Sequence, residues 1–93
     1  MRLLPGRRQA KVRFEFAAPA GNEVFVAGTF NNWDPRQFQL HDNPDEGLYA
    51  TVIPLQGGHH EYKFIVNGEW CVDQNCPDCV PNGAGSLNSV INV

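Results

Sequence analysis

The side chains best suited to chemistry in this chain are Trp33, Trp70 and Lys63. Trp70 follows an Asn-Gly pair, which is the preferred centre of a two-residue type I′ turn because both residues tolerate positive φ. The turn predicts a hairpin with four facing pairs: Val66 with Glu69, Ile65 with Trp70, Phe64 with Cys71 and Lys63 with Val72.

The predicted hairpin has one core face and one face that carries the candidate chemistry. Since side chains alternate along a strand, Lys63 and Trp70 share one face, while Tyr62 and Phe64 share the other. An unpaired buried ammonium is costly, so we expect Trp70 to be at least partly exposed beside Lys63. Such an indole either caps a sheet edge under the lysine stem or offers a platform on which the apolar face of a sugar ring stacks.

Trp33 is the second candidate aromatic. It lies in the polar segment Asn31–Pro35, where no alternating pattern buries it. Tryptophans in loops are often buried and fill gaps in the core, but the polar neighbours of Trp33 favour exposure. We therefore expect two exposed tryptophans.

Strand patterns dominate the rest of the chain and must position these side chains. Residues 41–47 are rich in turn formers, residues 73–86 are expected to be an irregular loop, and no segment has a convincing helical period. The expected fold is an all-β, immunoglobulin-like antiparallel β-sandwich of six or seven short strands. Strands are predicted at Lys11–Ala17, Glu23–Phe30, Leu48–Leu55, His59–Val66, Glu69–Val72 and Leu87–Val93.

Charge is unevenly distributed along the 93 residues, whose formal net charge is −3. Five of the seven basic residues precede Phe14, and all ten acidic residues follow it. We expect residues 1–10 to form a basic tail or edge and residues 11–93 to form one acidic domain. An acidic body argues against nucleic acid as a partner, and no segment is long and apolar enough to indicate a membrane partner.

The cysteines raise the possibility of a metal site. Cys71, Cys76 and Cys79, with His59 and His60 nearby, superficially offer a Cys3His zinc site. A single CxxC without a second pair is weak support, and Cys71 is expected to point into the core as a small hydrophobe. We therefore predict no metal and no cofactor. An odd number of cysteines without a visible secretory signal favours the cytoplasm.

An enzyme is the next alternative. A glycosidase needs two carboxylates about 5–9 Å apart across a cleft, whereas the acidic residues here lie mainly in turns and solvent-facing strand positions. No nucleophile elbow, phosphate loop or HExxH motif is present. The sequence predicts a non-catalytic protein.

Three segments together resemble a known family. They are Val24–Asp34 (VFVAGTFNNWD), His60–Trp70 (HEYKFIVNGEW) and Leu87–Val93 (LNSVINV). In this order they are similar to the glycogen-binding domain in the β subunit of AMP-activated protein kinase and to the family 48 carbohydrate-binding modules. The resemblance covers about residues 11–93 and implies binding of α-1,4-linked glucans such as glycogen, starch and maltooligosaccharides.

The resemblance also implies roles for five residues. Trp33 and Trp70 correspond to the indoles that stack on glucose rings, and Lys63 to a donor to sugar hydroxyls. Asn88 corresponds to an amide that hydrogen-bonds the ligand, with Ser86 in a similar hydroxyl-bearing role. Where the kinase-subunit modules carry a leucine that contacts the sugar ring, this chain has Ala84. The smaller side chain predicts a smaller apolar contact with the sugar.

A protein-interaction role is the remaining alternative, because fold alone does not determine function. A sandwich of this kind could dock an enzyme of glycogen metabolism or a kinase on a surface other than the glucan-binding face. The segment 73–83 looks closer to bacterial stand-alone modules, so the kinase assembly itself is not implied.

Overall fold

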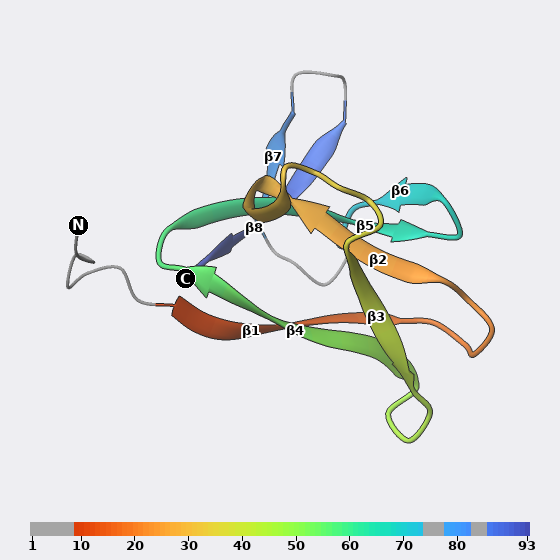
Figure 1. Ribbon diagram of the computed structural model, residues 1–93. Coiled ribbons are helices and arrows are strands. Elements are labelled where there is room, and N and C mark those ends of the chain that lie inside the picture. Colours follow the sequence, from red (N-terminus) through yellow and green to blue (C-terminus); the bar gives the residue numbers. More distant parts are fainter. Residues whose placement is uncertain (1–8, 74–77, 83–85) are drawn as a thin grey trace.

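The structure is a computed structural model that describes residues 9–73, 78–82 and 86–93. Within these ranges the chain forms eight strands and one short 3-10 helix (Figure 1). They are β1 (Gln9–Ala17), β2 (Val24–Gly28), η1 (Thr29–Asn31), β3 (Phe38–Asn43), β4 (Leu48–Gln56), β5 (His59–Val66), β6 (Glu69–Cys71), β7 (Cys79–Pro81) and β8 (Leu87–Asn92).

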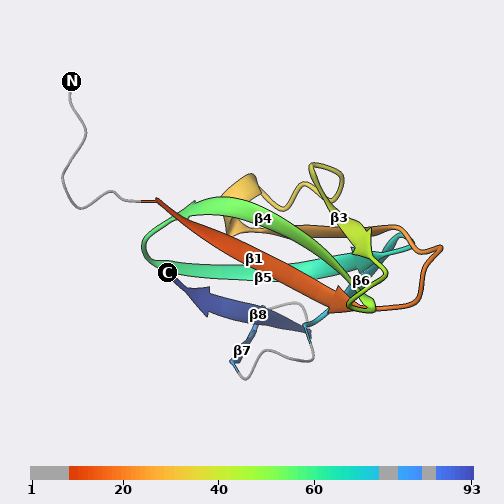
Figure 2. The ribbon, with the colours of Figure 1, turned by 90° about the horizontal axis from the view of Figure 1, so that it is seen from below.

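The strands form two antiparallel layers that share strand β3. The neighbour order is β1-β4-β3-β2-β5-β8-β7, and β6 also pairs with β5. The first half of β3 pairs with β2, and its second half, from His41 to Asn43, pairs with β4. Strands β1 and β4 therefore lie across β2, β5 and β8, as Figure 2 shows from below. The predicted all-β antiparallel sandwich is confirmed.

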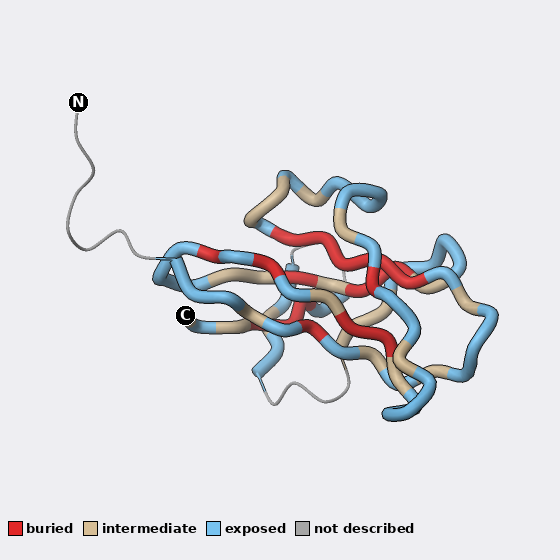
Figure 3. The backbone as a smooth tube through the Cα atoms, turned by 60° about the horizontal axis from the view of Figure 1, so that its bottom comes forward, coloured by how far each residue is buried: buried red, intermediate tan, exposed pale blue. Residues whose placement is uncertain are grey.

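The core fills the space between the two layers. Inward-facing side chains alternate with exposed ones along the strands, and Phe14 of β1 contacts Tyr62 of β5 edge to face, with 5.0 Å between ring centroids. Figure 3 shows the buried residues on the strands, with exposed residues between them and in the connecting loops. The central cluster comprises Phe14, Val24, Val26, Leu40, Tyr49, Ile53, Leu55, Tyr62 and Phe64.

The predicted hairpin is confirmed as β5 and β6. Asn67 and Gly68 have φ values of 51° and 86°, as a type I′ turn requires. Phe64 faces Cys71, Ile65 faces Trp70, and Val66 faces Glu69. The fourth predicted pair is not part of the ladder, because β6 ends at Cys71.

Three predictions about the elements were wrong. The segment His41–Asn43, predicted as a turn, is the half of β3 that pairs with β4. The segment 73–86, predicted as irregular, contains β7, whose three residues pair with β8. The strand predicted to reach Phe30 ends at Gly28, and η1 begins at the next residue, Thr29.

The first strand begins earlier than predicted. Strand β1 begins at Gln9, two residues before the predicted strand, and residues 1–8 of the predicted basic tail lie outside the described residues.

Of the residues that the structure describes, none belongs to a helix long and apolar enough to cross a membrane.

The Tyr49 hydroxyl ties β4 to the turn between β1 and β2. Tyr49 is buried, and its hydroxyl donates to the Pro19 carbonyl (3.0 Å) and accepts from the Asn22 N–H (3.0 Å). Tyr49→Phe leaves both backbone groups without this partner, so we expect the free energy of unfolding to fall by about 1–2 kcal/mol. Urea denaturation measures the loss, and an unchanged midpoint would contradict the assigned role.

Candidate functional site

A shallow, open cleft lies along the edge of β5, where its hydrogen-bonded neighbour changes. Strand β8 pairs with β5 up to Tyr62, and β6 pairs with it from Phe64 onward, so Lys63 lies between the two ladders. The cleft has a volume of about 590 Å³. Its lining residues are Thr29, Trp33, Glu61, Lys63, Trp70, Pro81, Asn82 and Asn88.

The cleft brings together four of the five residues predicted from the sequence, namely Trp33, Lys63, Trp70 and Asn88. The fifth, Ser86, is joined to it, because its hydroxyl oxygen accepts a hydrogen bond of 2.8 Å from the Lys63 ammonium. Residues from β5, β6 and β8 and the loop after η1 thus converge, although up to 55 positions of sequence separate them.

The two indoles form the apolar part of the cleft. Their ring centroids lie 6.4 Å apart, and the ring planes are inclined by 48°. Trp70 is 46% exposed, which confirms the expectation from the hairpin. Because the two rings are separate and tilted, they form a discontinuous apolar surface that is longer than one six-membered sugar ring.

Trp33 is held more firmly than its polar neighbours suggest. It is partly buried against Phe25, Ala27 and Ile65, a small cluster on the outer face of the sheet. Asn32 and Trp33 both adopt left-handed backbone conformations (φ 57° and 60°), and the Trp33 N–H donates to the Gly28 carbonyl at 2.9 Å. The expectation of an exposed Trp33 is therefore met only in part, since the turn folds its ring back onto the sheet.

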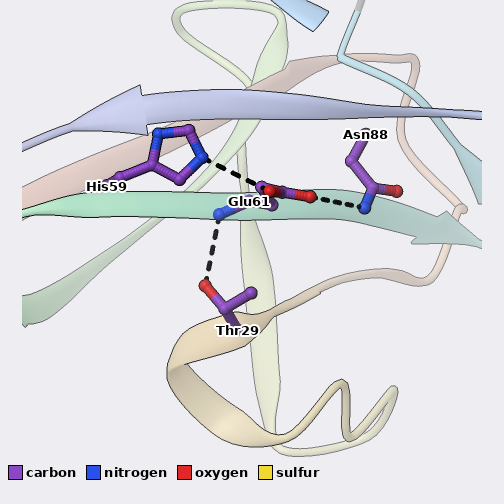
Figure 4. Close-up of polar contacts among 4 residues, drawn as sticks. All are labelled: Thr29, His59, Glu61 and Asn88. Carbon is purple, nitrogen blue, oxygen red and sulfur yellow. Dashed lines mark hydrogen bonds and ion pairs between the residues drawn. The ribbon is translucent and has the colours of Figure 1, made fainter. Parts of the chain in front are cut away.

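Glu61 is a polar residue of the cleft that the sequence analysis missed. Its Oε1 accepts from the Asn88 side-chain amide at 3.0 Å, and its Oε2 lies 3.3 Å from His59 Nε2 (Figure 4). The hydrogen bond from Asn88, followed by that from His59, lowers the pKa of Glu61 below its ordinary value, against the opposing effect of burial. Glu61 and Lys63 are two residues apart on one strand, so alternation alone could have placed Glu61 on this face.

Asn88 is the most buried polar residue of the cleft, at 7% exposure. Besides its bond to Glu61, its side-chain oxygen accepts from the Asn82 amide at 3.3 Å. Asn82 follows β7, so the strand that the sequence analysis missed also supplies this contact. Both ends of the Asn88 amide are therefore fixed before any ligand arrives.

The possible zinc ligands are not assembled in the described part of the chain. Cys71 is partly buried, with its thiol directed toward the Glu69 carbonyl (3.7 Å), and Cys79 is exposed. The expectation of a core Cys71 is thus only partly met. No three His, Cys, Asp or Glu side chains within residues 9–73, 78–82 and 86–93 are grouped as metal ligands. Cys76 and Ala84 lie outside the described residues.

Comparison with known proteins assigns the chain to a family. Residues 10–93 match the family described as the glycogen recognition site of AMP-activated protein kinase. The chain belongs to this family. The match spans every described element of the chain except the first residue of β1, so the cleft lies within it.

Individual relatives of the chain are subunits of the kinase. The chain is 36% identical over 73 residues to the 5'-AMP-activated protein kinase subunit beta-2 of Mus musculus and of Homo sapiens. It is 35% identical over 74 residues to subunit beta-1 of Sus scrofa. Each match covers 78% of this chain, but only 26%, 25% and 56% of the respective relatives, so the chain spans about a quarter to a half of their length.

Proposed function

We propose that this domain binds α-1,4-linked glucans, such as glycogen, starch and maltooligosaccharides, without catalysing their breakdown. The observation that carries the proposal is the pair of indoles, 6.4 Å apart, beside the Lys63 ammonium in one open cleft. The indoles would stack on the apolar faces of successive glucose rings, while Lys63, Asn88 and Ser86 would hydrogen-bond the sugar hydroxyls. Membership of a glycogen-recognition family supports the same ligand class.

The composition of the cleft supports binding without catalysis. Among the described residues that line it, Glu61 is the single carboxylic acid, whereas hydrolysis of a glycosidic bond ordinarily needs two. The proposed site therefore needs no cofactor and no metal.

We also propose a cytoplasmic location, on the basis of the cysteine content discussed above.

Titration with maltoheptaose, followed by tryptophan fluorescence and NMR chemical shifts, tests the proposal. We expect saturable binding with a dissociation constant in the micromolar to millimolar range, because ordering a flexible oligosaccharide offsets much of the contact energy. Both tryptophans of the chain lie in the cleft, so the fluorescence change reports on this site. Cellopentaose, whose glucose units are β-linked, is the matched control. No response to millimolar maltoheptaose would contradict the proposal.

The relatives favour a second role alongside the first. They are kinase subunits of which this domain spans only a part, so docking to an enzyme of glycogen metabolism or to a kinase is the alternative we propose. A docking surface on the β1 and β4 layer would be independent of the cleft. Removal of the Trp70 indole would then weaken glucan binding and leave the protein partner bound.

A further inference from the structure

The carboxylate of Glu61 lies at the polar end of the proposed binding cleft. It lines the cleft with Lys63, its neighbour on the same face of β5. The Glu61 side chain in the ion pair with His59 keeps 29% of its surface exposed. A carboxylate in this position faces both the protein and any molecule that occupies the cleft.

The surrounding contacts hold the Glu61 carboxylate in one orientation. Asn88 from β8 approaches one carboxylate oxygen, and His59 approaches the other. The Glu61 backbone N–H donates to the Thr29 hydroxyl at 3.2 Å, which fixes the strand itself (Figure 4). An ionised carboxylate has about four acceptor positions, so these two side-chain contacts leave acceptor capacity for a ligand.

Sugar hydroxyls supply the matching donors. Adjacent hydroxyls of a glucose unit both donate and accept, and hydrogen bonds to an ionised acceptor are roughly twice as strong as neutral ones. We propose that Glu61 is a specificity-determining residue, whose carboxylate accepts hydrogen bonds from sugar hydroxyls while it holds the Asn88 amide in place. The inference rests on the proposed function and assigns to that site an acceptor that complements the Lys63 donor.

The charged surroundings of Glu61 are simple. Among the described residues, His59 and Lys63, both on β5, are the titratable side chains that contact Glu61 or line the cleft with it. The segments packed next to it, Val24–Gly28, Thr29–Asn31 and Leu87–Asn92, contain no titratable residue. Because the folded protein lowers the pKa of Glu61 below 4.5, the carboxylate stays ionised at neutral pH and gains a proton only as the pH falls through that lowered pKa.

Glu61→Gln tests the inference, because it keeps the shape of the side chain and removes its charge. At pH 7 we expect the variant to bind maltoheptaose about three- to tenfold more weakly than the unaltered chain. As the pH is lowered toward about 3, the affinity of the unaltered chain should fall toward that of Glu61→Gln, whose own affinity should change little in this range. Circular dichroism identifies the pH values at which both proteins remain folded.

The outcomes separate this inference from the proposed function. If the unaltered chain binds maltoheptaose but Glu61→Gln binds equally well at pH 7, the inference is overturned and the proposed function stands. If the unaltered chain does not bind maltoheptaose, both the inference and the proposed function are contradicted. The acid profile of the unaltered chain needs no variant, so a constant affinity through the carboxylate range overturns the inference even if Glu61→Gln does not fold.

The contribution of His59 is separated by a second variant. His59→Gln keeps a hydrogen-bond donor beside Glu61 but carries no ionisable group. Loss of affinity below pH 4.5 should persist in His59→Gln if Glu61 is the responsible group. Its disappearance would show that the pH dependence requires the His59 side chain, and it would overturn the inference.

Discussion

Trp70→Ala is expected to weaken maltoheptaose binding at least about tenfold while it leaves the domain folded. The indole is 46% exposed and lies on the short strand β6 at the sheet edge, so its removal leaves no buried cavity. It is also one of the two indoles that line the cleft, and tryptophan side chains commonly dominate the binding energy of an interface.

Isothermal titration calorimetry or NMR measures this loss of affinity, because the substitution removes one of the two fluorescent residues. Val52→Ala is the matched control, since Val52 is a comparably exposed apolar residue (54%) on β4 in the other layer. It should bind maltoheptaose like the unaltered chain. Binding that survives Trp70→Ala unchanged would show that the glucan site lies elsewhere on the domain.

Gly28→Ala should both destabilise the domain and disturb the cleft. Gly28 pairs with Tyr62 where β2 and β5 meet, and an added Cβ would overlap the Glu61 carbonyl oxygen and the Phe30 ring. A backbone oxygen cannot move aside without shifting the strand, so we expect a loss of about 1–3 kcal/mol in the free energy of unfolding. The Gly28 carbonyl also accepts from the Trp33 N–H, so maltoheptaose binding should weaken as well.

The matched control for this substitution is Gly57→Ala. Its added Cβ would lie 3.5 Å from the Val93 carbonyl oxygen, an ordinary contact. Thermal unfolding should show a melting temperature several degrees lower for Gly28→Ala, at roughly 4–8 °C for each kcal/mol in a domain of this size. Equal melting temperatures for the two variants would mean that β2 relaxes around the new side chain without cost.

Local rules were sufficient where one turn determined the structure. The Asn67-Gly68 pair fixed the β5–β6 register, and that register placed Lys63 and Trp70 on the correct face. The inference needed no contact between distant parts of the chain, because a two-residue turn determines which residues face each other.

The errors occurred where distant contacts override local preference. Asp42 and Asn43 favour turns, yet they extend β3 because Tyr49 and Leu48 of β4 provide the opposing ladder. Strand β7 has only three residues and ends in proline, so it has no strand pattern to detect and depends on its pairing with β8. Each of these strands can be recognised only from the neighbouring strand with which it pairs.

The site was predictable in part for the same reason. The family resemblance supplied Trp33, Ser86 and Asn88, and the hairpin independently supplied Trp70 and Lys63. Neither indicated the turn that folds the Trp33 ring onto Ile65, since that contact joins two strands. Glu61 could have been found from its alternation with Lys63, but its bond to Asn88 depends on the β5–β8 pairing.

The position of β5 makes ligand binding a property of the whole domain. Strand β5 is hydrogen-bonded to β2 along one edge and to β8 and β6 along the other, and such interior strands generally lose their amide protection only in global unfolding. A glucan held by Glu61, Lys63 and their neighbours would therefore stabilise the folded state as a unit. At a free concentration one hundred times its dissociation constant, the ligand would add about 2.7 kcal/mol. Saturation with glycogen would slow amide hydrogen exchange throughout both layers, far beyond the surface that the sugar touches.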